Sequence, residues 1–254
     1  MSTNLCSDLL LLMLVPKERI ASITHLATGP AAVLLPGAAD GVPTNRATAE
    51  EVVAQVPDLI LASPWSATAL RRLAAQVNAP VVEIDAANSF ADIRRITREV
   101  GQAVGEPARA EALVAQMDRT LAELAATAPE RPIEVVAWNG GDAVPGQGTL
   151  THAIIEAAGA RNLSARLPGA AAESFGLEEL LAARPQAILR GADRFDAPSL
   201  RDSSGEHAVV QAGFAGRQII YPATLHACGL PQSAEAARQL RTALERLPPG
   251  DVRW

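Results

Sequence analysis

The sequence predicts an α/β protein built from two Rossmann-like lobes with parallel sheets, joined by a single long backbone helix. Three observations predict this fold class. Strands and helices alternate along the chain, a helix–proline–strand unit occurs twice, and a long apolar stretch of helical period separates the two copies. Alternation of this kind is typical of parallel sheets with right-handed crossovers.

The repeated unit occupies residues 50–62 and residues 177–189. Each copy reads as a helix with glutamates in its first turn, which stops just before Pro57 or Pro185 and is followed at once by a buried strand. Glutamates suit the positive end of the helix dipole, and the residue before a proline is disfavoured in the helical conformation. Two copies of one such unit predict two similar lobes.

Residues 1–88 are expected to form the N-terminal lobe. Asp8 can cap a helix that runs to about Val15. The other expected elements are a short strand at 20–24, a loop rich in Gly, Pro and Ala at 28–45, the first repeat copy, a helix from Pro64 to Val77 and a buried strand at 80–84.

Residues 89–128 are expected to form the connecting helix. Ser89 to Asp92 has the pattern of a capping box, and apolar residues then keep a near-helical spacing to Leu124. Gly105 to Pro107 marks a break or a kink in this stretch. A helix of this length between two lobes is a stiff rod and not a flexible linker.

Residues 129–254 are expected to form the C-terminal lobe. Its expected elements are a strand at 133–138, a glycine-rich turn, a helix at 149–158, the second repeat copy, a strand at 217–221 and a closing helix at 233–247. Prolines on either side of the closing helix suit these boundaries.

Composition excludes one class of function. The net charge is −6, the isoelectric point is near 5.3, and no run of Lys or Arg occurs. Binding of nucleic acid by a basic surface is therefore not expected.

The apolar run Leu9–Val15 resembles the core of a signal peptide, but no positive residue precedes it and Pro16–Arg19 stands where a cleavage site would be. A buried helix is the favoured interpretation, since the run is too short to span a bilayer.

Several motifs in order along the chain carry a resemblance to a known family. They are Asn4–Asp8 before an apolar helix, Pro16–Ile20, Ala49–Ala62, Ser89–Gly105, Gly148–Leu150 with Gly159–Leu163, and Cys228–Pro231. Through them the chain is similar to substrate-binding proteins of ABC importers for cobalamin, haem and iron–siderophore chelates. The resemblance implies a metal chelate or corrinoid held between two lobes that move little, and an ABC permease dimer as the partner at the membrane.

The resemblance also carries expectations about compartment and assembly. It implies a periplasmic monomer whose export signal is absent from this chain, and the family's first strand is reduced to Met1–Thr3. If Met1 is the native start, the protein is instead a cytosolic sensor or carrier on the same fold. No resident cofactor is expected, and no preformed metal site, since Cys and His do not pair at zinc-binding spacing.

Ligands of parallel sheets lie at the carboxyl ends of the strands, so the candidate site residues are those that follow strands directly. Trp65 and Trp138 are candidate flat walls for a planar ligand, and the alternative for each is a hydrophobic plug of its lobe. His25 and His226 are candidate ligands of a chelated metal, or else ordinary surface histidines. Asn45 offers a polar contact.

A glycine-rich stretch follows the strand that ends near Trp138. Asn139 to Asp142 and Gly146 to Thr149 bracket a short loop ahead of a helix, where backbone N–H groups can hold an anion. A plain connecting loop is the alternative, because the stretch has neither a lysine nor the spacing of a Walker motif. Asn139 is the candidate ligand-binding residue here.

Cys6 and Cys228 are the two cysteines of the chain, and they are expected on different lobes. Three interpretations stay open: soft ligands for a metal, a disulfide that locks the lobes, or two small buried side chains.

Matching helix starts in the two lobes carry glutamates, Glu50 or Glu51 in the first and Glu178 or Glu179 in the second. The resemblance implies that one acidic residue per lobe docks onto arginines of the permease, and a helix-dipole role explains them equally well.

Catalysis is the alternative to a ligand-binding function. No GxSxG elbow, HExxH, Walker A or dinucleotide fingerprint occurs in the sequence, so no catalytic residues are expected. Cys6 with His25 is the one conceivable thiol dyad, and no third member is evident. The expected function is therefore ligand binding and delivery.

Overall fold

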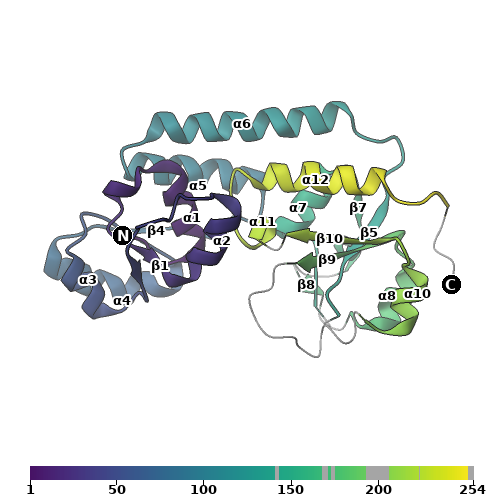
Figure 1. The fold of residues 1–254 in the computed structure, drawn as a ribbon, viewed down its shortest axis with the longest axis horizontal. Helices are drawn as coiled ribbons and strands as arrows, with labels where there is room; N and C mark the ends of the chain where they lie inside the picture. Colours follow the sequence, from purple (N-terminus) through teal and green to yellow (C-terminus); the bar gives the residue numbers. More distant parts are fainter. Residues whose placement is uncertain (141–142, 168–170, 173–174, 193–205, 223, 251–254) are drawn as a thin grey trace. The chain divides into compact units, whose positions relative to one another are not determined.

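The computed structural model describes residues 1–254 apart from 141–142, 168–170, 173–174, 193–205, 223 and 251–254 (Figure 1). The chain divides into two units. The first comprises Met1–Gln116 with Ala227–Pro231, and the second comprises Met117–His226 with Gln232–Trp254. Each unit contains a parallel sheet covered by helices, so the predicted fold class is confirmed.

The sheet of the first unit has residues 1–3 at its centre. Its strands are β1 (Ile23–Thr24), β2 (Thr44–Asn45), β3 (Ile60–Ala62) and β4 (Val81–Glu83). β1 pairs with β2 and β3 pairs with β4, both in parallel. On one side, the N–H of Ser2 donates to Ser22 O. On the other side, Thr3 N donates to Leu61 O and Leu61 N donates to Met1 O. The spatial order is thus β2, β1, residues 1–3, β3, β4, which in chain order is 3-2-1-4-5, the Rossmann order.

Helices cover both faces of this sheet. They are α1 (Leu5–Leu14), α2 (Thr28–Leu34), α3 (Ala49–Gln55), α4 (Pro64–Ala74) and α5 (Phe90–Ala103), with 3-10 turns η1 (Lys17–Arg19), η2 (His25–Ala27) and η3 (Ala75–Val77). α1, α2 and α5 share one buried cluster with Leu61, while α3 and α4 share another with Ile60 and Ala62. Alternate residues of β3 therefore face opposite layers, as the pleat requires.

Two local expectations for the first unit were wrong. Asn4, not Asp8, caps α1, since its Oδ1 accepts from Cys6 N and Ser7 N, and Asp8 lies one turn inside the helix. The expected loop at 28–45 contains α2 and β2. The apolar run at 9–15 is buried, as predicted.

The sequence repeat is reproduced in the backbone. α3 and α8 (Leu177–Ala183) each have 7 residues. Each ends at a left-handed residue, Val56 with φ 43° and Arg184 with φ 48°, which directly precedes a proline. Because the proline ring disfavours the right-handed helical conformation at the residue before it, both helices stop at the same place. β3 and β9 (Ala187–Ala192) follow.

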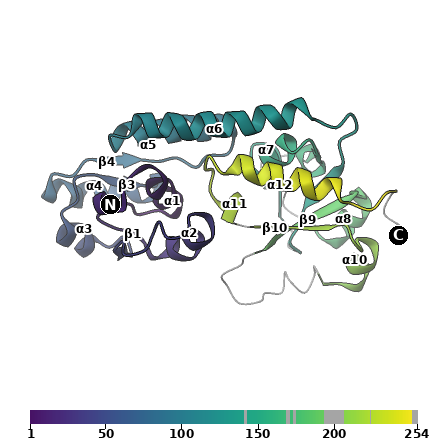
Figure 2. The ribbon, with the colours of Figure 1, turned by 45° about the horizontal axis from the view of Figure 1, so that its top comes forward.

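The segment expected to be one connecting helix is two helices. α5 ends at Ala103 and α6 (Pro107–Ala126) begins after Gly105, whose φ is +75°. Arg98 forms a two-pronged ion pair with Glu111, so the chain reverses and the start of α6 lies beside α5 (Figures 1 and 2). A Cβ on Gly101 would lie 2.3 Å from the Cβ of Ala110, so glycine permits this close packing. α6 continues from the first unit into the second.

The second unit has the strands β5 (Glu134–Ala137), β7 (Arg161–Asn162), β9 and β10 (Gln218–Pro222) in the parallel order β10-β9-β5-β7. β6 (Val144–Pro145) and β8 (Ala171–Ala172) form a separate antiparallel pair. The helical elements are α7 (Leu150–Ala157), η4 (Leu163–Arg166), α8, α10 (Ala208–Gly213), α11 (Thr224–Ala227) and α12 (Ser233–Glu245). α12 packs on β10 and α7, and α8 and α10 share a buried cluster with Val136 and Ile188.

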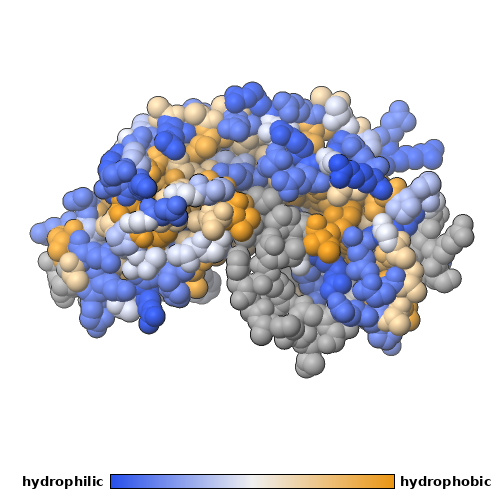
Figure 3. Space-filling model, in the orientation of Figure 1, coloured by the Kyte–Doolittle hydropathy of each residue, from blue (hydrophilic) through white to orange (hydrophobic). Residues whose placement is uncertain are grey.

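Hydrophilic side chains cover most of α6 and α12 on the face seen in Figure 3. A hydrophobic patch lies over β10, where Ile220 is exposed. Among the described residues, no helix has both the length and the apolar character needed to cross a bilayer.

Candidate ligand-binding site at the carboxyl edges of the sheets

The strand order of the first unit places a topological switch point between residues 1–3 and β3. Connections from the two central strands of such a sheet leave in opposite directions, and this leaves a crevice beyond their carboxyl ends where ligands bind. Here residues 1–3 lead into the N-terminus of α1, and β3 leads through Ser63 into α4. The side chains that follow these two strands are therefore the first candidates for ligand contact.

Trp65 is the second residue of α4 and stands at this switch point. Its side chain is 95% exposed, the highest value among the exposed large hydrophobic residues. Pro64 at the first helical position suits the start of α4, because its missing N–H would have no helical partner there. An exposed indole beside a switch point is placed where its flat face could cover an apolar face of a ligand.

Trp138, in contrast, is a core residue and not a site wall. It is 1% exposed and lies in a buried cluster with Val136, Leu180 and Phe214. Its Nε1–H donates to Phe175 O at 3.2 Å, so the one polar atom of the indole is satisfied inside the core. Trp138 therefore fills the core of its lobe, which was the alternative interpretation for this residue.

His25 directly follows β1 on the same edge as Trp65. It opens η2, its side chain is exposed, and its Nδ1 lies 3.4 Å from Asn45 O. In the tautomer with the proton on Nδ1, that nitrogen donates to the carbonyl and Nε2 carries a free lone pair. Metal-binding histidines commonly hold a backbone carbonyl with the other ring nitrogen in this way. His25 is thus suited to ligate a metal ion through Nε2.

Asn45 is buried, and its side-chain amide is bonded within the first unit. The residue is 1% exposed, and its Nδ2 donates to Ser2 O at 2.9 Å and to Ser22 Oγ at 2.8 Å. Its Oδ1 accepts from Ala47 N at 2.9 Å, which holds Ala47 at its positive φ of 58°. The amide therefore joins the central strand, the approach to β1 and the turn after β2.

Asp8 carries a role that the sequence analysis missed. The residue is fully buried, and its Oδ2 accepts from both Thr24 N at 3.1 Å and Thr24 Oγ1 at 2.5 Å. Burial raises the pKa of this carboxyl, and the hydrogen bonds from Thr24 oppose the rise. The sequence does contain a signal for this role, an acidic residue at the edge of an apolar run, but the same signal also suits a helix cap.

Cys6 and Cys228 form a disulfide with a Cα–Cα distance of 5.2 Å. Neither sulfur is then available as a thiolate ligand or nucleophile, so the metal-ligand and thiol-dyad interpretations are wrong for this state. The expected placement on different lobes is also wrong, because Cys228 belongs to the segment 227–231 of the first unit. A Cβ on Gly229 would lie 2.7 Å from Ala87 O, and Leu230 is buried, so this segment is packed into the first unit.

In the second sheet the switch point lies between β5 and β9. Asn139 follows β5, and its Oδ1 accepts from Gly191 N at 2.8 Å. Its exposed side chain thus bridges the carboxyl ends of the two strands. The Thr149 hydroxyl donates to Gly146 O and accepts from His152 N, which is the pattern of a capped connecting turn. Gly141 and Asp142 lie outside the described residues.

His226 lies in α11, which follows β10, and lines a small cavity of about 40 Å³ together with Ile219, Ile220, Ala236, Gln239, Leu240 and Ala243. A space of this size suits a water molecule and not a chelate. Burial lowers the pKa of His226 to about 4. The imidazole is therefore neutral at pH 7, and the cavity beside it is too small to hold a chelate.

We expect His226 to make the protein sensitive to acid. Its pKa falls from 6.5 in the unfolded chain to about 4 in the fold, so below pH 6.5 the unfolded state binds the proton more readily. The free energy of unfolding should thus fall by about 3 kcal/mol between pH 7 and pH 4 on account of this group. Urea unfolding should show that the free energy of unfolding falls less between pH 7 and pH 4 for His226→Leu than for the native protein, and an equal fall would contradict this role.

The four candidate docking glutamates divide into two kinds. Glu51 accepts from Arg46 N, Thr48 N and Thr48 Oγ1, and these bonds lower the pKa of its carboxyl. Glu179 accepts in the same way from Gly176 N at 2.9 Å. Glu50 and Glu178 are exposed one position earlier in the matching helices. The repeat therefore pairs one capping glutamate with one solvent-facing glutamate in each unit.

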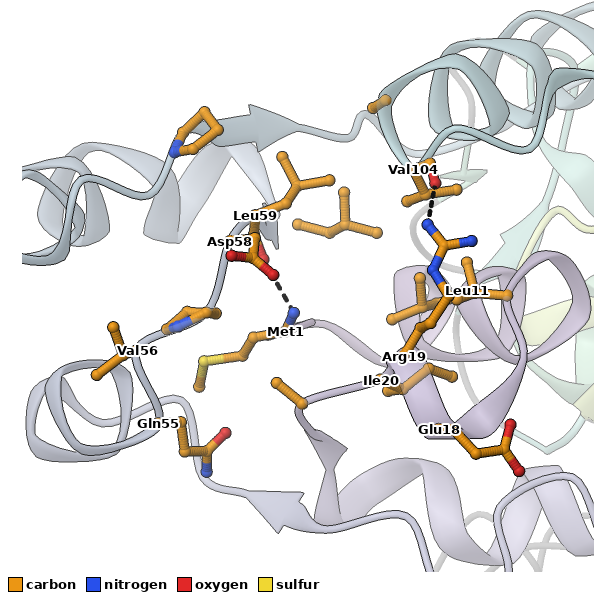
Figure 4. Close-up of a pocket in the computed structure, with 16 residues that line it drawn as sticks. Met1, Leu11, Glu18, Arg19, Ile20, Gln55, Val56, Asp58, Leu59 and Val104 are labelled. Carbon is orange, nitrogen blue, oxygen red and sulfur yellow. Dashed lines mark hydrogen bonds between the residues drawn. The ribbon is translucent and has the colours of Figure 1, made fainter.

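A larger cavity of about 590 Å³ lies at the opposite, amino edge of the first sheet (Figure 4). Leu11, Val56, Leu59 and Val104 are among its walls. Two of the charged groups around it have partners: the Met1 ammonium donates to Leu59 O, and Arg19 binds Glu106 and Val104 O. Burial lowers the pKa of that ammonium. The sequence analysis did not predict this cavity.

Two Rossmann-like units with aligned repeats define a class of protein, the two-unit α/β binding proteins. The chain belongs to the periplasmic binding protein family, whose sequence model matches residues 1–210. The resemblance inferred from the motifs is confirmed. No curated protein matches the sequence.

Solved structures of this family share the fold. The haem-binding protein HutB of Vibrio cholerae has a TM-score of 0.77 at 18% identity, with 96% of this chain and 97% of that chain covered. A haem-binding protein from Pseudomonas aeruginosa has a TM-score of 0.72 at 20% identity, with 100% and 97% covered. The molybdate-binding protein MolA of Haemophilus influenzae has a TM-score of 0.72 at 16% identity, with 96% and 85% covered.

Within the described residues, no group of three or more His, Cys, Asp and Glu side chains is placed to hold a metal ion. His25 by itself offers one nitrogen, which suits a metal that brings its other ligands with it.

Proposed function

We propose that this protein is the substrate-binding component of an ABC importer and that its ligand is a metal chelate or corrinoid, such as haem, a ferric siderophore or cobalamin. The observation that carries the proposal is the 95% exposed indole of Trp65 at the switch point of the first sheet, with the His25 imidazole on the same edge. Related folds that bind haem support a planar metal chelate.

The two side chains supply complementary interactions. The flat face of Trp65 covers an apolar face of the ligand and removes both surfaces from water. His25 Nε2 donates its lone pair to the metal, while the bond from Nδ1 to Asn45 O keeps the ring oriented. Because both residues follow strands of one sheet, their spacing is set before the ligand arrives, which lowers the ordering cost of binding.

The disulfide supports a periplasmic location. Disulfides persist in oxidising compartments and are rare in the reducing cytosol. The bond between Cys6 and Cys228 therefore favours an exported binding protein over the cytosolic sensor on the same fold. It also removes the free thiol on which the enzyme alternative depended.

A ligand screen tests this function directly. We expect the melting temperature of the purified protein to rise with haem, cobalamin or one of several ferric siderophores, because a ligand that binds only the folded state stabilises it by mass action. Molybdate and free Fe³⁺ serve as controls for bare ions. A rise with molybdate and with no chelate would reject the proposed ligand class.

We further propose that Glu50 and Glu178 dock the protein onto arginines of the permease. Replacing both by alanine should lower ligand-stimulated ATPase activity of the reconstituted importer by about ten-fold and leave ligand affinity unchanged, since rim charges act mainly on association. Glu51→Gln with Glu179→Gln is the matched control, which should leave docking largely intact. Equal stimulation by the Glu50→Ala, Glu178→Ala variant and the native protein would refute this docking role.

A further inference from the structure

The first turn of α1 holds a buried carboxylate that the site described above does not use. Asp8 is fully buried, and it is followed by the buried leucines and methionine of residues 9–14. One oxygen, Oδ2, accepts both hydrogen bonds from Thr24, while Oδ1 has no hydrogen-bond partner among the described residues. Thr24 therefore supplies the hydrogen bonds that this carboxyl group accepts.

Stability alone does not account for an aspartate at this position. A buried carboxylate costs free energy because it gives up its hydration, and one of its oxygens here is uncompensated. An asparagine of the same shape could accept from Thr24 with less to desolvate. What the carboxylate supplies is two charge-assisted hydrogen bonds to one residue, which are shorter and stronger than neutral ones.

We propose that Asp8 is a positioning residue for ligand binding: it holds Thr24 at the end of β1 and thereby sets the position of His25, the next residue. This inference rests on the proposed function, in which His25 Nε2 contacts the metal of the ligand.

The chain of contacts is short and continuous. Asp8 Oδ2 binds both the backbone N–H and the hydroxyl of Thr24, so neither the main chain nor the side chain of that residue can rotate freely. His25 follows in a 3-10 turn whose start is therefore anchored, and its Nδ1 has a second contact at Asn45 O. Asp8 itself is held by α1, whose first turn is tied to residue 228 through the Cys6 disulfide.

Four variants test the inference with the chelate that gives the largest shift in the ligand screen. His25→Ala is expected to weaken binding by more than about ten-fold. Asp8→Ala is expected to weaken it by about ten-fold and to change the visible spectrum of the bound metal toward that of His25→Ala. Asp8→Asn keeps the acceptor without its charge, so its binding and spectrum should be intermediate between those of the native protein and of Asp8→Ala. Thr24→Val loses only the hydroxyl donor, so its affinity and spectrum should also be intermediate between those of the native protein and of Asp8→Ala.

The double variant Asp8→Ala, His25→Ala separates positioning from a general effect on the fold. If Asp8 acts through His25, the double variant binds no more weakly than His25→Ala alone, since the two changes are then not additive. Fully additive losses, or an Asp8→Ala spectrum equal to the native one, would overturn the positioning role while leaving the proposed function intact. Native affinity in His25→Ala would instead reject the proposed contact with the metal. Should Asp8→Ala fail to fold, Thr24→Val gives the same comparison.

Discussion

Replacing Trp65 by alanine is expected to weaken binding of the metal chelate by about 30-fold, or about 2 kcal/mol. The loss comes from the apolar area of ligand and indole that returns to water. Because the side chain is 95% exposed in the protein alone, its removal should leave the melting temperature of the ligand-free protein unchanged. Isothermal titration of native and variant protein measures the first quantity, and calorimetric unfolding measures the second.

Two comparisons give this prediction its controls. Trp65→Phe keeps a flat ring and should retain most of the affinity. Trp138→Phe should lower the melting temperature, because the indole is buried and bonded to Phe175 O, and should change affinity little. Unchanged affinity in Trp65→Ala would remove the main support for a planar ligand at this edge.

Breaking the disulfide is expected to cost about 2–5 kcal/mol of stability. The bond closes a loop with a sequence separation of 222, which restricts the unfolded chain strongly. The variant Cys6→Ser, Cys228→Ala suits the two environments, since Cys228 is 2% exposed and Cys6 is half-buried. For a chain of this length we expect the melting temperature to fall by about 10 °C.

A reducing agent provides the internal control. Dithiothreitol should lower the melting temperature of the native protein to that of the variant and should have no effect on the variant itself. Thiol titration of the unfolded, unreduced native protein should find no free cysteine, as neither is free in the structure. Equal melting temperatures for native and variant protein under oxidising conditions would contradict this stabilising role.

The repeat was the most informative part of the sequence, because its signals are local. A proline after each helix and glutamates in each first turn act on the backbone within a few residues, whatever the rest of the chain does. The structure accordingly has the same helix length, the same left-handed end at Val56 and Arg184, and the same following strand in both copies. Composition and motif order were sufficient for the family.

The connecting segment shows where local signals were insufficient. Helical periodicity extends on both sides of Gly105, and periodicity does not reveal whether a glycine bends a helix or reverses the chain. The reversal depends on contacts between residues well apart in sequence, such as Arg98 with Glu111 and Gly101 with Ala110. Those contacts form only when the two helices have already packed.

The amino-acid order was enough to predict two α/β units, the repeated helix–strand unit and several residues that follow strands, but not α2 and β2 within residues 28–45. Side-chain burial was settled by packing in three dimensions. Trp65 and Trp138 both follow strands, yet one indole is in solvent and the other fills a core. Asp8 and Asn45 likewise bind backbone at the ends of strands instead of facing solvent. Position along a chain specifies the edge of a sheet, but the direction of a side chain depends on which distant residues fill the space beside it.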